Sequence, residues 1–186
     1  MKNIAPAVVV MTTLGLISAS SFAASTGTIT FNGELTDTTC NVDVNGQGSD
    51  ATVTLPTVSI SELTTDKQVT GRTSFNMNLT DCVIGTTNGK SKVSAFFQPG
   101  STVDLSTGRL NNVGGSATNV QLQLLDATGS FNVINVGNTD QVSSTEYVDI
   151  ASDGTATLPY AVEYYALGQT TAGTVTSSVV YNLQYN

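Results

Sequence analysis

Hydrophobic and polar residues alternate with a period of two along much of this chain. The stretch GTITFNGEL (27–35) shows the alternation most clearly, because Ile29, Phe31 and Leu35 fall on one side and polar residues on the other. This pattern is typical of a β-strand with one buried face. Its place near the start of the chain is unusual, since terminal segments are commonly frayed unless something holds them. The sequence therefore predicts a strand whose partner has to be found.

Further strands are predicted at short intervals along the rest of the chain. The alternating stretches cover residues 34–44, 50–58, 73–82, 91–100, 119–126, 131–136, 146–150, 157–167 and 174–186. A single helical turn is expected within residues 59–66, and the glycine-rich stretch 112–119 is expected to be a loop. Many short strands separated by Gly and Asn indicate an all-β sandwich of the immunoglobulin type.

The first residues have the features of a secretory signal. Lys2 precedes an apolar stretch at 5–17, and Ser21 and Ala23 place small residues at the two positions that a signal peptidase recognises. The apolar stretch is too short for a membrane span, which needs about 20 residues. We expect cleavage after Ala23 and export of a mature chain of residues 24–186.

The composition of the mature chain limits its partners. Export removes only Lys2 among the charged residues, which leaves five Lys and Arg against fourteen Asp and Glu, a formal charge of −9. An acidic surface with few basic side chains argues against nucleic acid or an anionic membrane as a partner. The length suits one domain with a substantial core.

No catalytic constellation is present in the sequence. The chain has no His, which excludes Ser-His-Asp and Cys-His arrangements and most metal sites. Asp149 and Asp153 are near neighbours in sequence, but they lie around a Gly-containing turn, where acidic residues are ordinary turn formers, and Asp81 stands at a strand end, which is also a usual place for an acidic residue. We expect no enzyme activity, no cofactor and no metal.

Cys40 and Cys82 are the only cysteines of the chain, and both lie in the exported part. In an oxidising compartment the simplest interpretation is one disulfide that closes a loop of 43 residues, which would be worth about 4 kcal/mol. The alternative, a reactive or metal-binding thiol pair, lacks a second cluster to complete the site.

The last predicted strand raises the same question as the first. Tyr181, Leu183 and Tyr185 share one face, and the sequence given stops inside this strand. An immunoglobulin-type sandwich normally continues with one more strand beside it, and an uncovered hydrophobic edge is an aggregation hazard. The sandwich is thus predicted to lack one strand at its C-terminal side and to carry one extra at its N-terminal side. Each end could complete the other between molecules.

Four stretches, including one near each end of the chain, carry a resemblance to a known family. They are GTITFNGEL followed by Cys40, FNMNLTDC (75–82), GSATNVQLQLLD (115–126) and YYALGQTTAGTVTSSVVYNLQYN (164–186). Together they resemble pilins of chaperone–usher fimbriae, especially major subunits of the type 1 kind. Gly173, fourteenth from the C-terminus, and the penultimate Tyr185 agree with those pilins, and the resemblance covers essentially the whole mature chain.

The resemblance implies a fold completed by donor-strand complementation: an incomplete immunoglobulin-like β-sandwich that lacks its final strand. A periplasmic chaperone would first lend a strand to the open groove, and at the outer-membrane usher the N-terminal extension of the next subunit would replace it. The implied domains are a signal peptide (1–23), a donor-strand extension (24–35) and a pilin domain (36–186). The implied donor row is Gly27, Ile29, Phe31, Gly33 and Leu35, with a weak contact at Gly27. The implied chaperone and acceptor-groove strand contains Gly173, Val179, Tyr181, Leu183, Tyr185 and Asn186.

The implied function is that of a structural subunit, in the major-pilin class, of a surface fimbrium that supports adhesion. A minor subunit or adaptor would share both ends of the sequence. A tip adhesin of this family would carry an extra lectin domain and no donor extension, and the chain also lacks Trp, the best sugar-stacking residue. A self-contained immunoglobulin-like domain, with the N-terminal strand folded back on its own sheet, would show the same alternation.

Overall fold

The computed structural model describes residues 27–86 and 88–186 and divides the chain into two units, residues 1–34 and 35–186. The expected signal peptide and its cleavage site lie outside the described residues. In the first unit, residues 27–34 form no strand and are exposed, with Ile29 78% and Phe31 89% accessible to solvent. The strand expected at 27–35 is therefore not formed within the single chain, and its pairing with another molecule stays a prediction. A strand requires a ladder of hydrogen bonds with a neighbouring strand, and no strand of the described residues pairs with residues 27–35.

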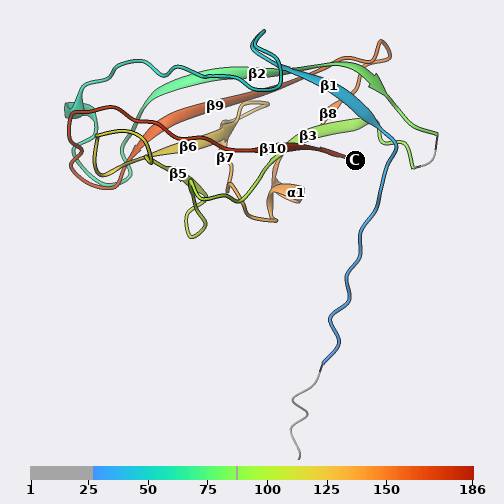
Figure 1. The fold of residues 1–186 in the computed structure, drawn as a ribbon, viewed down its shortest axis with the longest axis horizontal. Coiled ribbons are helices and arrows are strands. Elements are labelled where there is room, and N and C mark those ends of the chain that lie inside the picture. Colours follow the sequence, from blue (N-terminus) through green and yellow to red (C-terminus); the bar gives the residue numbers. More distant parts are fainter. Residues whose placement is uncertain (1–26, 87) are drawn as a thin grey trace, which may run out of the picture. The chain divides into compact units, whose positions relative to one another are not determined.

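The second unit contains two antiparallel β-sheets (Figure 1). The larger sheet has seven strands in the order β1-β2-β9-β6-β5-β4, with β7 paired to β6. Its strands are β1 (Thr39–Val44), β2 (Val69–Val83), β9 (Ala156–Ala166), β6 (Val120–Asp126), β5 (Arg109–Asn111), β4 (Val103–Asp104) and β7 (Asn132–Val133). The long strands β2 and β9 pair over most of their length and form the centre of the sheet.

The smaller sheet has three strands in the order β10-β3-β8. They are β10 (Tyr181–Tyr185), β3 (Lys92–Phe97) and β8 (Val148–Asp149). A 3-10 turn, η1 (Ile60–Glu62), and one short helix, α1 (Gln141–Ser144), complete the elements found in the described residues. None of the helices in this part of the chain is long and apolar enough to cross a membrane. Strand β10 lies at one edge of its sheet, and β1 lies at one edge of the larger sheet.

The core lies between the two sheets and is formed by alternate side chains of their central strands. Tyr160 of β9 is its largest fully buried side chain, and its ring contacts Phe97 of β3 edge to face at 5.1 Å. The Tyr160 hydroxyl accepts a hydrogen bond from the Ala95 backbone N–H at 2.9 Å, so it also ties the two sheets together. Burial of the Tyr160 hydroxyl raises its pKa, because the charged form would be poorly solvated.

The expected disulfide is confirmed. Cys40 of β1 and Cys82 of β2 are bonded, with a Cα–Cα distance of 4.1 Å. They join neighbouring strands of the larger sheet near the C-terminal end of β2, which ends at Val83. The bond therefore anchors the edge strand β1 to the central part of its sheet.

Most of the expected strands are confirmed in position. The stretches 73–82, 91–100, 119–126 and 157–167 correspond to β2, β3, β6 and β9, and η1 is the expected helical turn. The stretches 34–44, 131–136, 146–150 and 174–186 form strands over only part of their length, at β1, β7, β8 and β10. The strand expected at 50–58 is wrong, because this segment has no ladder partner. The short elements β4, β5 and α1 were not anticipated.

Candidate strand-acceptor groove

One wall of a groove is formed by β10 and by residues 174–180 that precede it. The side of this segment away from the groove is bonded to the fold: the Gln98 N–H donates to the Val180 carbonyl at 2.8 Å, and the Val113 N–H donates to the Thr176 carbonyl at 3.0 Å. Farther along, β10 pairs with β3 from Tyr181 to Tyr185. The smaller sheet therefore ends at this segment, and the groove begins beyond its free edge.

The opposite wall is formed by residues 49–58. Val53 and Leu55, two positions apart, are partly buried and pack against the core, so they form the inward face of this segment. No backbone hydrogen bond joins residues 175–180 to residues 49–58 among the parts of the chain that the structure describes. Side chains of both walls therefore line the groove, but no backbone hydrogen bonds of the described residues join the two walls into one sheet.

Two cavities lie between these walls and share Thr176 as a lining residue. The first, of about 470 Å³, has core side chains as its floor, among them Phe75, Met77 and Phe97. The second, of about 450 Å³, lies beside Leu63 and Tyr164 near the start of the C-terminal segment. Pockets of this size that are lined mainly by apolar groups suit the burial of apolar side chains.

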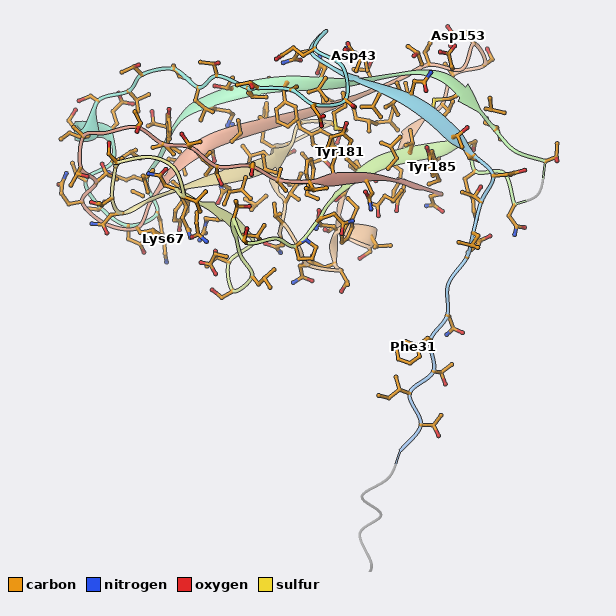
Figure 2. The ribbon with its side chains drawn as sticks, in the orientation of Figure 1. Phe31, Asp43, Lys67, Asp153, Tyr181 and Tyr185 are labelled. Atoms are coloured by element: carbon orange, nitrogen blue, oxygen red, sulfur yellow. A yellow bond between two sulfur atoms is a disulfide. The ribbon has the colours of Figure 1, made fainter. Side chains whose placement is uncertain are left out.

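Two tyrosine hydroxyls connect the fold to the 49–58 wall. The Tyr181 hydroxyl donates to the Ser49 carbonyl at 2.8 Å, and the Tyr164 hydroxyl donates to the Pro56 carbonyl at 3.2 Å. Burial raises the pKa of both hydroxyls, and the Asp50 carboxylate raises that of Tyr181 further. Both groups therefore remain neutral hydrogen-bond donors at neutral pH. Figure 2 shows Tyr181 and Tyr185 at the two ends of β10.

The structure brings the predicted groove residues together along one segment. Val179, Tyr181, Leu183 and Tyr185 are all partly buried and pack against the core. The backbone of Asn186 is held by Lys92, whose N–H and carbonyl exchange hydrogen bonds with it at 3.0 and 2.9 Å.

Gly173 has a different role, because it allows a close approach between backbones. A Cβ at this position would lie 2.5 Å from the Ala117 nitrogen, which no real side chain tolerates. Glycine therefore permits the start of the C-terminal segment to lie directly against residues 112–119.

The predicted donor residues Gly27, Ile29, Phe31 and Gly33 belong to the first unit, and Leu35 opens the second. Their apolar side chains are exposed, Leu35 to 90%. Figure 2 shows the Phe31 side chain standing away from the backbone of its segment.

Sequence reasoning did not identify the 49–58 wall or the floor of the groove as parts of the site. The alternation of Val53 and Leu55 could have found the wall, because it marks an inward face without specifying a neighbour. The floor residues are ordinary core side chains by their sequence pattern. Only the absence of a strand above them makes them part of a groove.

The acidic side chains considered for catalysis have structural partners. Asp149 pairs with Lys92 at 2.8 Å, and the Asp153 carboxylate accepts hydrogen bonds from the Thr155 N–H at 3.1 Å and hydroxyl at 2.7 Å. The bond from the Thr155 hydroxyl lowers the pKa of Asp153. Within the described ranges, no group of three or more Cys, Asp or Glu side chains is placed to hold a metal ion.

Comparison with known proteins identifies relatives along most of the chain. The family described as "Type-1 fimbrial protein, A" matches residues 55–186. The chain is 44% identical to the major fimbrial subunit SMF-1 of Stenotrophomonas maltophilia over 176 residues, which cover 92% of this chain and all of the relative. It is 40% identical to the F17 fimbrial protein of Escherichia coli, covering 92% and 96% of the two chains. It is 33% identical to the type-1 fimbrial protein A chain of Escherichia coli K12, covering 96% of each.

Solved structures show the same fold. The P pilus rod subunit PapA matches with a TM-score of 0.57 and 21% identity over 79% of this chain and 99% of its own. A chaperone–usher pilus studied for rod uncoiling matches with a TM-score of 0.54 and 23% identity over 90% and 100% of the two chains. The fold is therefore the incomplete, immunoglobulin-like all-β sandwich that was expected from the sequence.

Proposed function

The chain belongs to the type-1 fimbrial protein A family, and from this membership we propose that it is the major structural subunit of a chaperone–usher fimbria. The family consists of structural, non-enzymatic proteins. The observation that carries the proposal is the apolar groove beside β10, which has the lining of a site for one more strand. Similarity to a relative described as a major fimbrial subunit favours the major over the minor class.

The donor is the N-terminal segment of a second copy of the chain. Strand addition of this kind gains affinity from main-chain hydrogen bonds and register from pockets for alternate side chains. Ile29, Phe31 and Leu35 supply the apolar row, and each contributes roughly 1.5–3 kcal/mol when it is fully buried. Gly33 suits a point where the donor backbone approaches the groove closely. The final strand of an immunoglobulin-like sandwich runs antiparallel to its neighbour, so Leu35 is expected at the Gly173 end of the groove.

This linkage makes a fibre. The donor and the acceptor are different surfaces of the same subunit, so each added copy presents a new donor, and the head-to-tail contact does not close into a ring. Completion of the sandwich also removes an exposed edge that would otherwise promote unspecific pairing. The fimbria is accordingly a polymer of identical or related pilin subunits.

The free edge needs protection before assembly. We assign this role to a periplasmic chaperone that pairs with Tyr181, Leu183 and Tyr185 and binds the Asn186 carboxylate through basic residues. An outer-membrane usher then exchanges the chaperone strand for the donor segment of the next subunit. Residues 1–23 direct export to the periplasm, residues 24–35 are the donor extension, and residues 36–186 form the pilin domain. The final location is the cell surface.

Deletion of residues 24–30 tests the proposal, because it removes Ile29 and keeps Cys40 and the whole groove. The variant should accumulate with the chaperone and accept a donor strand from a wild-type subunit, but it should not extend a chain. A matched control with Thr28→Ser and Thr30→Ser leaves the apolar row intact and should polymerise normally. Electron microscopy and gels run without boiling distinguish long fimbriae from capped, short products.

Two results would contradict the proposal. If the deletion variant fails to accumulate with excess chaperone, the segment belongs to the subunit's own fold, and a self-contained domain becomes the better interpretation. If the variant accumulates and still forms long fimbriae, the donor lies elsewhere in the chain.

A further inference from the structure

Three Asn-Gly pairs occur in this sequence, at 32–33, 45–46 and 88–89. In such a pair the backbone nitrogen of Gly can attack the side-chain amide carbon of Asn, because Gly adds no side chain that hinders the approach and restricts its backbone little. The attack releases ammonia and closes a five-membered succinimide ring. Water then opens the ring at one of its two carbonyls and leaves either aspartate or isoaspartate. The net change is consumption of one water and loss of one ammonia, with no oxidant or cofactor.

The environment of Asn32 places no obstacle in the way of this reaction. Residues 27–33 form no strand or turn, and no hydrogen bond links them to one another. Asn32 and Gly33 are both exposed, and a Cβ built on Gly33 would meet no atom within 4 Å. The Gly33 nitrogen and the Asn32 amide are therefore free to approach each other.

Asn45-Gly46 offers the opposite case within the same chain. The Asn45 side-chain oxygen accepts a hydrogen bond from the Asn76 N–H at 2.8 Å, which fixes the amide that would be attacked. The Gly46 N–H donates to the Asp43 carboxylate at 2.8 Å, which occupies the attacking nitrogen. Both residues also hold positive φ angles of 51° and 78° in the turn after β1. The third pair is also held locally, since Asn88 has a φ of 51° and its carbonyl accepts a hydrogen bond from the Thr36 hydroxyl at 2.8 Å.

We infer that Asn32 is a site of spontaneous deamidation in the unassembled subunit and that its conversion to isoaspartate destroys the donor activity of the segment. This consequence rests on the donor role proposed above. Isoaspartate carries the main chain through the side-chain carbonyl, so it inserts one extra methylene between Phe31 and Gly33. Because a strand alternates with a period of two, a change in backbone length puts the two halves of the apolar row out of phase. Ile29 and Phe31 can then no longer enter the groove together with Leu35.

Assembly protects the same residue. In an added strand the backbone is held extended by ladder hydrogen bonds on its two edges, which points the Gly33 nitrogen away from the Asn32 amide carbon. Asn32 lies on the polar row, so its side chain remains exposed in the fibre and only the backbone constraint changes. The fraction of subunits deamidated at Asn32 therefore increases with the time that a subunit spends with its donor segment unpaired. An aged subunit could still accept a strand, and it would end a chain as a terminator.

The test compares chaperone-bound wild-type subunits with assembled fimbriae, both kept at physiological temperature and mildly alkaline pH. Peptide mapping with fragmentation that distinguishes isoaspartate from aspartate follows positions 32, 45 and 88 over time. We expect isoaspartate at position 32 in the chaperone-bound subunit, much less at 45 and 88, and almost none at 32 in fimbriae. The aged subunits should lose their ability to extend chains in proportion to the isoaspartate at 32, while their ability to accept a strand is kept.

Two variants separate the chemistry from general ageing. Asn32→Gln keeps a polar amide on the same row but would require a larger ring, so it should retain donor activity through the same incubation. Asn45→Gln is the matched control and should age like the wild type. Loss of donor activity in Asn32→Gln at the wild-type rate overturns the inference, as does equal isoaspartate at positions 32 and 45.

The outcome also distinguishes this inference from the proposed function. If no isoaspartate forms at position 32, the inference fails and strand addition is unaffected. If isoaspartate forms there fully and chains still extend, the donor role of the segment fails as well, and the deletion of residues 24–30 should then also leave extension intact.

Discussion

Replacement of Phe31 by Ala should weaken the link between neighbouring subunits more than any other single change in the polar or apolar row of the donor segment. Phe31 has the largest side chain in that row and is 89% exposed in the described segment. Almost all of the free energy of its burial is therefore available to drive strand addition. The Phe side chain would enter an apolar groove whose floor includes Phe75 and Met77.

The magnitude follows from the area that is removed from water. Full burial of a Phe side chain contributes about 1.5–3 kcal/mol, and Ala retains only a small part of that gain. A loss of this size corresponds to a change of about 10- to 100-fold in the dissociation constant. The empty space left in the groove adds to the loss where the walls cannot close over it.

The assay measures how fast assembled fimbriae release subunits in denaturant, with gels run without boiling to separate polymers from monomers. Affinity changes within one interface appear mainly in the dissociation rate, so Phe31→Ala should release subunits about 10- to 100-fold faster. Thr30→Ala is the matched control, because it truncates a neighbouring side chain on the polar row. Equal dissociation rates for Phe31→Ala and the wild type, or equal acceleration by Thr30→Ala, would refute the assignment of the two rows.

Three further predictions concern the pilin domain itself. Cys40→Ser should lower the free energy of unfolding by about 4 kcal/mol, because the disulfide restricts the entropy of the unfolded chain by closing a loop. The variant should also reduce periplasmic subunit levels. Free-thiol labelling of unreduced wild-type protein at both cysteines would contradict this prediction. Tyr160→Phe removes the acceptor of the buried Ala95 N–H and should cost about 1–3 kcal/mol in chemical denaturation, whereas Tyr164→Phe, whose hydroxyl is bonded near the surface, should cost less. Hydrogen bonds from Ser106 and Gln121 lower the pKa of Asp104 from 3.8 to about 2. Its contribution to the free energy of unfolding should therefore be present above pH 3.8 and be lost as the pH falls toward 2. Asp104→Asn should flatten that part of the plot of unfolding free energy against pH, and an unchanged plot would exclude the contribution.

The long central strands could be predicted because their periodicity and their pairing agree. Strands β2 and β9 carry inward side chains such as Phe75 and Leu158 at every second position, and each has a neighbour on both sides. The disulfide could be predicted because the chain has only two cysteines and both follow the expected signal peptide. The strands β4 and β5 span only two and three residues, too few to show a period. Helix α1 has only four residues, too few to show the helical periodicity of apolar positions that would predict it.

The remaining disagreements have one physical cause. Residues 27–35, 50–58 and 174–180 all alternate in sequence, yet the structure assigns no strand to any of them. Alternation records which face of a segment is to be buried, whereas a strand also needs a neighbour that satisfies its backbone groups. In the pilin domain the two segments without a ladder, 50–58 and 174–180, are the two walls of the groove, and their inward side chains already pack against the core. The third segment has the same pattern with its apolar row exposed. A chain whose fold is completed by another copy of itself must encode both parts of that contact. One part is a groove with room for a strand between its two walls. The other is a segment with the alternation of a strand and no sheet of its own to join.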